Sequence, residues 1–343
     1  MNKAILLICL LIFQFNFGQT SETEQTSTST KKDANAFNDF YPIAVQPSFG
    51  YLSNMNERED ILFDAKPVVY YSIINTILEN MQADENKAGN AFYITFQPHI
   101  RMYAENSKPV KTPSYRFLFG WQHMIKTKSN NFFTWAFETG HYSNGQSGCA
   151  FLSGEEDESM PCTDFHATIT DDSNLSALLN RTNGNFSTNT TKLTLNFRFN
   201  ELNKANEPFK IHSFTASYEL YHNLFVGLFD FGGYTDFDIS IYGRHRFGAG
   251  YAYIHQYKPK FRYSLEQKIE LIQGAHPFVE PLRSETTVTF YPFNPPIGIF
   301  ITYVHGHDNY NYRFVDSGNQ IGVGVSWDLF QPFQISRAKT TDL

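Results

Sequence analysis

Apolar and polar side chains alternate along most of the chain after about residue 90. The clearest alternating runs are 92–102, 115–122, 131–145, 189–200, 213–220 and 321–329. A period of two is typical of β-strands, because successive side chains of a strand point to opposite faces. Clusters of Asn, Ser, Gly and Pro separate the runs and mark turns. The pattern predicts about ten to twelve strands in antiparallel up-and-down order.

The two faces of these strands differ in chemistry. One face is unusually aromatic, and the opposite face carries charged and polar groups, as expected of a wet lumen. We therefore predict an all-β fold, an antiparallel up-and-down transmembrane β-barrel of about twelve strands over residues 46–330. A soluble β-sandwich is the alternative, since its strands also alternate. No stretch after residue 90 shows a helical period, and segment 69–80 is ambiguous between a first strand and a short helix.

The two ends of the chain differ from this pattern. Residues 1–18 combine a positive start at Lys3 with an apolar run from Ala4 to Phe13, which predicts a signal peptide. A membrane anchor is the alternative, but the run is shorter than the ~20 residues that a spanning helix needs. Residues 19–45 are polar and are expected to form a disordered tail, and residues 331–343 a C-terminal tail.

Charge and hydropathy bear on two questions, nucleic-acid binding and membrane location. The net charge is −7, from 27 Lys and Arg against 34 Asp and Glu, without a visible basic patch. A nucleic-acid partner is therefore not expected, because phosphate backbones need clustered cations. The mean hydropathy of −0.37 looks soluble. It does not argue against a barrel, because lipid-facing and lumen-facing residues cancel in the average.

Three cysteines carry information about compartment. Cys9 lies in the predicted signal peptide, which leaves Cys149 and Cys162 in the mature chain. A close pair of cysteines in an exported protein predicts a disulfide. Metal binding is the alternative, but no His or Cys stands at C-x-x-C spacing to complete such a site.

The strand predicted over residues 131–145 carries the clearest candidate chemistry. His141 and Ser143 fall on the same face of this predicted strand as Phe137, and that face is the aromatic one. Side chains two residues apart are neighbours, so the imidazole can accept the proton of a hydroxyl that is a poor nucleophile without a base. The alternative is a His and a Ser that only hydrogen-bond to loop water, and short H-x-S spacing alone does not separate the two.

A third group must hold the imidazole in the correct tautomer. Asn189 lies at the start of the next strand, on the same apolar face as Leu193. Asn180 lies in a segment typical of a turn or a strand end. We therefore predict that Asn189 orients His141. An amide at this position places no anion against lipid, where an unpaired charge is costly.

The segment His141-Tyr142-Ser143-Asn144-Gly145-Gln146-Ser147 resembles the H-x-S-N-G-x-S signature of the outer-membrane phospholipase A family. Ser187-Thr188-Asn189 is similar to the S-x-N element of that family, and segments 306–310 and 320–330 resemble its last two strands. The resemblance implies a twelve-stranded barrel in the outer membrane of a Gram-negative bacterium. It also implies that His141, Ser143 and Asn189 are catalytic and that the substrates are membrane glycerophospholipids.

The same resemblance implies calcium at the active site of a homodimer, with Gln146 and Ser147 among the ligands. Segment 144–188 is longer here than the family's loop and contains the acidic run 155–158. Calcium takes about six to eight oxygen ligands, so this run is chemically suitable. A solvated loop surface is the alternative interpretation of the run. The tail that follows Phe330 is a second departure from the family.

The sequence thus predicts a calcium-dependent, serine-type phospholipase A, hydrolysing acyl esters as phospholipase A1 or A2 and as lysophospholipase. Its backbone amides near residues 143–145 are expected to stabilise the oxyanion. One rival hypothesis is a non-catalytic outer-membrane barrel, porin-like or structural. Another is a secreted soluble β-protein that binds calcium through the acidic loop.

Overall fold

The structure is a computed structural model that describes most of residues 40–328. The positions left out of this range are 56–57, 83–87, 107–109, 128–130, 205–207, 226–227, 231–232, 259 and 293–295. All described residues belong to one unit, residues 34–343. The predicted signal peptide 1–18, most of the tail 19–45, the aromatic Phe330 and the C-terminal tail 331–343 lie outside the described residues.

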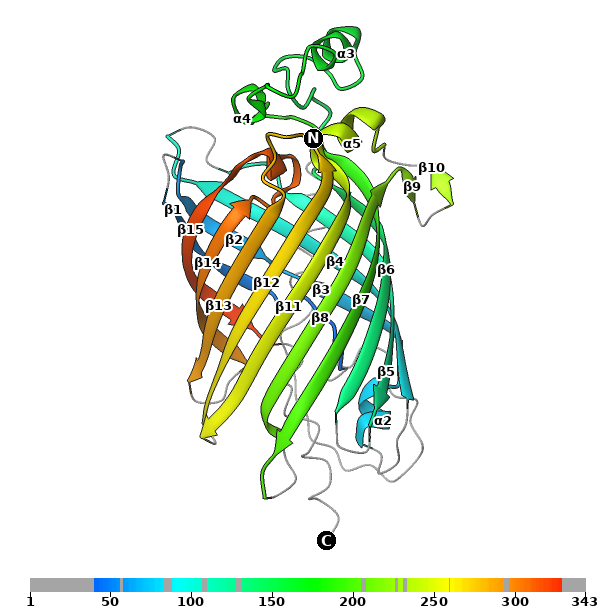
Figure 1. Cartoon of the computed structure of the whole chain (residues 1–343), viewed down its shortest axis with the longest axis vertical. Coiled ribbons are helices and arrows are strands. Elements are labelled where there is room, and N and C mark those ends of the chain that lie inside the picture. The colour runs from blue at the N-terminus through cyan, green and yellow to red at the C-terminus, as the bar shows by residue number, and fades with distance from the viewer. Residues whose placement is uncertain are drawn as a thin grey trace, which may run out of the picture. The chain divides into compact units, whose positions relative to one another are not determined.

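One antiparallel sheet closes on itself as a barrel (Figure 1). Its strands are β1 (Ser48–Asn54), β2 (Ile61–Lys66), β3 (Val69–Asn75), β4 (Ala88–Tyr103), β5 (Ser114–Lys126), β6 (Phe132–Ser143), β7 (Ser187–Leu202), β8 (Pro208–His222), β11 (Gly243–Lys258), β12 (Phe261–Ala275), β13 (Leu282–Pro292), β14 (Ile297–His307) and β15 (Ser317–Trp327). A separate ribbon is formed by β9 (Leu224–Phe225) and β10 (Phe229–Asp230).

The barrel has twelve strands by its pairing. β1 pairs with β15 along its whole length, from Ser48 opposite Ser326 to Asn54 opposite Gln320, and this contact closes the ring. β2 and β3 both pair with β4, so they are two parts of one interrupted strand. Pro67 lies between them and has no N–H to offer a ladder. The predicted all-β, up-and-down barrel of about twelve strands is confirmed.

Within the described part of the chain, five short helices lie in the loops: α2 (Ile77–Gln82), α3 (Met160–His166), α4 (Leu175–Leu178), α5 (Asp236–Tyr242) and the 3-10 helix η1 (Asn311–Val315). Four of them, α3, α4, α5 and η1, follow residue 90, where the sequence shows no helical period. These helices are too short to show a period, and side-chain caps hold some of their ends. Ser159 caps α3, and Thr235 with Asp238 forms a capping box on α5. The ambiguous segment 69–80 contains both β3 and the start of α2.

No helix among the described residues is long and apolar enough to cross a membrane.

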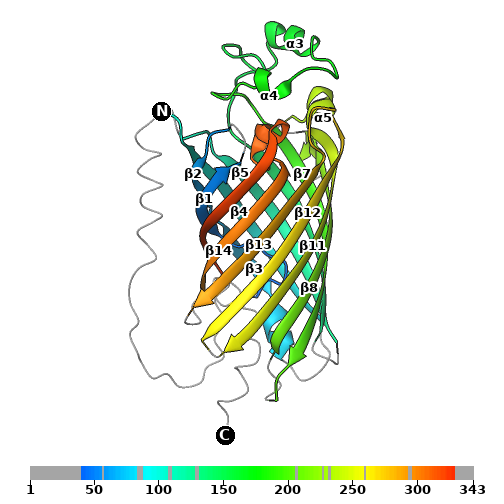
Figure 2. The same ribbon diagram turned by 60° about the vertical axis from the view of Figure 1, so that its left-hand side comes forward.

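The outer face of the barrel is apolar and the inner face is polar. Phe117, Phe119 and Phe137 are each about two-fifths exposed on the outside, whereas Arg116 and Glu219 point inward and form an ion pair of 2.8 Å. An apolar outer belt around a polar lumen is the construction of an outer-membrane barrel. The protein is a multi-pass outer-membrane protein, and the strands run obliquely around it (Figure 2).

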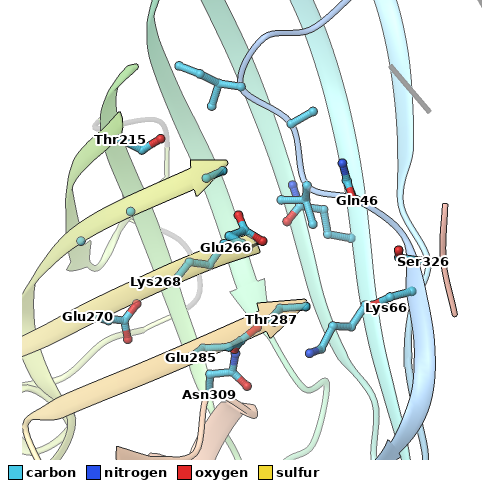
Figure 3. A pocket seen from close by; sticks show the side chains of 18 of the residues that line it. Gln46, Lys66, Thr215, Glu266, Lys268, Glu270, Glu285, Thr287, Asn309 and Ser326 are labelled. Atoms are coloured by element: carbon cyan, nitrogen blue, oxygen red, sulfur yellow. Dashed lines mark ion pairs between the residues drawn. The ribbon is translucent and has the colours of Figure 1, made fainter. Parts of the chain in front are cut away.

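The lumen holds a polar cavity of about 690 Å³. Lys66 and Gln46 face the wall that carries Glu266 and Glu285 (Figure 3). Residues 40–46 line this cavity, and the Gln122 amide exchanges two hydrogen bonds with the backbone of Ile43. The predicted disordered tail 19–45 therefore ends too late, because Phe40 and Tyr41 are buried in an apolar cluster with Ile77, and Ile43 is hydrogen-bonded to Gln122.

The end of the barrel with the longest loops is closed by an apolar core. Outer-membrane barrels carry long loops on the extracellular side and short turns on the periplasmic side, which makes this the extracellular end. Phe151 and Phe186 of the β6–β7 loop pack with Tyr242 of α5, Phe314 of η1 and the strand residue Tyr142. This core covers the lumen directly behind the candidate site.

Candidate functional site

Strands β6 and β7 bring the predicted site residues together on the outer face of the barrel. His141 lies opposite Asn189, and Ser143 lies opposite Ser187. Phe137 is exposed on the same face of β6, whereas Glu138 and Tyr142 line the lumen or its core. The parity argument from the sequence therefore places His141 and Ser143 on the correct face.

Asn189 is fully buried and has a fixed orientation. Its Nδ2 donates to the carbonyl of Asn223 at 2.8 Å, which turns its Oδ1 toward His141 Nδ1 at 3.0 Å. Because an amide oxygen can only accept a hydrogen bond, His141 Nδ1 carries the proton and is the donor of this bond. In the neutral imidazole, Nε2 is then the proton acceptor. This is the tautomer that a general base for a serine needs.

Ser143 is the last residue of β6, two positions beyond His141. Both side chains are partly buried and project from one face of the strand. Ser143 also borders an extracellular cavity of about 510 Å³ formed by the β6–β7 loop and the region of α5. A hydroxyl at the rim of a cavity and on the lipid-facing wall is accessible from both the cavity and the membrane.

Strand β6 is anchored from inside the barrel at Tyr142, the residue between His141 and Ser143. The Tyr142 hydroxyl accepts a hydrogen bond from the Asn311 backbone N–H at 2.8 Å, and Arg116 lies 4.2 Å above its ring. Arg116 also donates to Tyr221 and pairs with Glu219. These interior contacts hold the backbone of β6 at the position that carries the candidate site.

The motif continues into an ordered turn after Ser143. The buried Asn144 side chain accepts from Phe186 N–H at 3.0 Å and donates to the Gly184 carbonyl at 2.8 Å, which joins the two ends of the β6–β7 loop. Gly145 follows with a φ of +65°, a conformation that favours glycine. The glycine of the motif is thus explained by backbone geometry.

The β6–β7 loop contains the predicted disulfide, and Cys149 is bonded to Cys162. His166 Nε2 lies 3.5 Å from one sulfur and 3.4 Å from the other. The sequence analysis missed this histidine because it follows Cys162 at helical spacing within α3. Asn180 has a different role from that of Asn189. It is buried in the loop, where its side chain bonds the Cys149 carbonyl and Asn183.

The candidate calcium ligands are only partly brought together. Gln146 lines the extracellular cavity, but Ser147 does not, and the Ser147 carbonyl instead accepts from Asp157 N–H at 2.7 Å. From the acidic run, Asp157 and Glu158 line the cavity, whereas Glu155 and Glu156 do not.

The sequence analysis missed one acidic group in this cavity. Asp238 of α5 lines it as well. Burial raises the pKa of this carboxyl to about 6, against the hydrogen bonds from Thr235. The distance of 81 residues between Asp157 and Asp238 in the chain explains why no local motif reveals the pair. The T-x-x-D capping pattern at Thr235 was the available signal for α5 itself.

An ion pair fastens the β6–β7 loop to the β14–β15 loop. Asp316 is buried and receives two hydrogen bonds from Arg181, at 2.8 and 3.0 Å, and one from Ser176 at 2.6 Å. Burial alone would raise the pKa of Asp316, but the hydrogen bonds and charge of Arg181 outweigh it and hold the pKa below its usual value. The loop over the site is therefore clamped in place.

Comparison with known proteins adds structural neighbours but no family. No protein-family model matches the chain, and no curated protein matches its sequence. Outer membrane phospholipase A from Escherichia coli has 11% identity and a TM-score of 0.48, covering 85% of this chain and 95% of its own.

Two further structural neighbours illustrate the range of functions among them. The phospholipase dimer with bound calcium from Salmonella typhi has 12% identity and a TM-score of 0.47, covering 87% and 97%. An outer membrane channel from Pseudomonas putida F1 has 8% identity and a TM-score of 0.43, covering 84% and 97%. Enzymes and channels both occur among these neighbours, and at such values the similarity assigns no function.

Proposed function

We propose that the protein is a serine-type phospholipase A that hydrolyses acyl esters of membrane glycerophospholipids at the outer membrane. The observation that supports it most is the hydrogen bond of 3.0 Å between His141 Nδ1 and Asn189 Oδ1 on the outer wall, two residues from Ser143. A nucleophile and base on this wall suit a substrate that arrives from the bilayer. The resemblance of the H-x-S-N-G-x-S motif supports the substrate class.

The reaction follows from these groups. Ser143 Oγ attacks the ester carbonyl, and His141 Nε2 takes the seryl proton while Asn189 Oδ1 stabilises the imidazolium that forms. The same proton then goes to the departing alcohol oxygen of the lysolipid. Water, activated by His141, hydrolyses the acyl-serine ester and releases the fatty acid.

The oxyanion needs a hydrogen-bond donor close to Ser143. The Asn144 N–H already donates to the Phe186 carbonyl at 3.0 Å. We therefore assign the role to the Gly145 N–H, next in the chain. A side chain on Gly145 would meet no atom within 4 Å, so there is open space beside this residue.

Calcium dependence is part of the proposal. The cavity beside Ser143 is lined by the carboxylates of Asp157, Glu158 and Asp238 and the amide of Gln146, without a Lys or Arg among its lining residues. Hard oxygen donors of this kind fit calcium, which would supply positive charge near the oxyanion. Two parts of the proposal come from the resemblance alone. They are Ser147 as a calcium ligand and the homodimer as the active form.

The rival porin-like function is disfavoured by the interior of the barrel. Residues 40–46 occupy part of the lumen, and buried Arg101 joins Asp64 of β2 to Asp308 of the β14–β15 loop at 2.6 and 2.8 Å. Such a network fills part of the lumen with fixed side chains, which we take as support for the enzyme. A structural barrel without activity remains the outcome that the following test can reveal.

The decisive experiment measures fatty-acid release by the purified protein from phosphatidylcholine in mixed micelles, with calcium and with a chelator. We expect calcium-dependent release by the wild type and a loss of more than about a thousandfold for Ser143→Ala. Ser153→Ala, in the same loop and exposed, is the matched control and should keep wild-type activity. A wild type that is inactive in calcium would refute the enzyme and favour the non-catalytic barrel.

A further inference from the structure

The β9–β10 ribbon lies outside the barrel beside the candidate site. The ribbon follows β8, pairs Phe229 with Phe225, and projects from the side of the barrel near its extracellular end (Figure 1). β9 lies against β6 and β7. The ring of Phe225 meets that of Phe119, on the outward face of β5, at 6.4 Å.

The surface of the ribbon is apolar and exposed. Leu228 is 76% exposed, Phe229 is 62% exposed and Leu224 is 40% exposed. Through Phe225 and Phe119, this surface continues the aromatic belt that faces the lipid. Aliphatic and aromatic groups without hydrogen-bonding atoms fit hydrocarbon chains, and a patch continuous with the belt is within reach of the outer leaflet.

The base of the ribbon is joined to the candidate site. The Asn223 carbonyl, which fixes the amide of Asn189, belongs to the turn between β8 and β9. His222 holds the same turn, because its Nδ1 accepts from Leu224 N–H at 3.2 Å and its Nε2 therefore donates to Thr191 Oγ1 at 2.9 Å. The apolar ribbon and the orienting amide are thus parts of one structural unit.

We propose that the β9–β10 ribbon binds the fatty acyl chain of the lipid whose ester reaches Ser143, and so selects long-chain substrates. This assignment rests on the proposed function and goes beyond it by naming a specificity element. The occupant is an acyl chain rather than a protein, because the ribbon continues a lipid-covered surface and begins one residue after Asn223, whose carbonyl contacts Asn189.

The first test compares two substrates of one enzyme. Leu228→Ala/Phe229→Ala should lower kcat/KM about tenfold on a long-chain phosphatidylcholine, mainly through KM, and leave a soluble butyrate ester unaffected. Ile299→Ala/Ile301→Ala, on the outward face of β14 with similar exposure, is the matched control and should change neither. Equal losses on both substrates, or no loss on the long chain, would overturn the assignment.

The second test does not depend on activity. A nitroxide on Leu228→Cys, in phosphatidylcholine vesicles, should collide more with dissolved oxygen than with a water-soluble nickel chelate, and a nitroxide on Thr168→Cys should do the reverse. A water-exposed label at 228, or a cross-link between two copies there, overturns the assignment while leaving the enzyme intact. An inactive wild type overturns the proposed function and the assignment together.

Discussion

Replacing Asn189 with alanine removes the group that we propose orients the His141 base. Two hydrogen bonds are lost, the one from His141 Nδ1 at 3.0 Å and the one to the Asn223 carbonyl at 2.8 Å. The imidazole can then rotate or take the other tautomer, in which Nε2 carries the proton and no longer accepts from Ser143. We expect a lower kcat with little change in KM.

The magnitude follows from the first of these bonds. Leaving a neutral polar group without its hydrogen bond costs at most about 1–3 kcal/mol, and His141, the group left here, is partly buried. If this cost falls on the reactive arrangement, kcat falls about 5- to 150-fold, since about 1.4 kcal/mol corresponds to a factor of ten. The loss stays smaller than for Ser143→Ala, because the base and the nucleophile remain present.

The assay is fatty-acid release under saturating substrate, with far-UV circular dichroism as a check on folding. Asn196→Ala is the matched control: Asn196 lies on the same strand, is 5% exposed, and bonds Ser213 and Thr215 on the lumen side. It should keep its kcat. Wild-type kcat in Asn189→Ala, or equal losses in both variants, would refute the orienting role.

Three further predictions concern the frame around the site. The purified protein should migrate faster on a gel unboiled than boiled, because a closed barrel resists detergent; identical migration contradicts the closed barrel. Replacing Cys149 and Cys162 by serine should make the β6–β7 loop sensitive to protease, since the crosslink contributes about 3 kcal/mol in the chain-entropy model for its separation of 13 residues; unchanged cleavage rates would argue against this. The clamp at Asp316 should be complete above pH 3.8, the ordinary pKa, and should be lost as pH falls through its lowered folded pKa; Asp316→Asn, measured by the same proteolysis, should remove this pH dependence.

The strand pattern was predictable because membrane barrels impose a strict alternation of environments. Phe137, His141 and Ser143 fall on the outer face because each lies an even number of residues from the others. The same alternation favoured Asn189 over Asn180, the resemblance agreed with that choice, and the structure places Asn189 directly opposite His141. Parity cannot show that Asn189 also bonds the Asn223 carbonyl, since that contact depends on the turn after β8.

The parts that escaped prediction depend on contacts between distant segments. Asp238 joins Asp157 at one cavity only because α5 folds back over the barrel end. Ile43 is fixed by Gln122, and this contact holds the short, mostly apolar segment 40–46 inside the lumen. Neither contact leaves a periodic trace in the sequence, because each joins one side chain to a segment that is distant in the chain.

The anchoring of Tyr142 has a consequence for how sequence changes affect this protein. Its hydroxyl accepts from the backbone of Asn311, and its ring lies under Arg116. Arg116 and the β14–β15 loop do not lie on the outer surface that carries the candidate site, so substitutions there look remote from it. They act on the peptide units next to His141 and Ser143, so variation inside the barrel can alter the geometry of the candidate site on its outer wall.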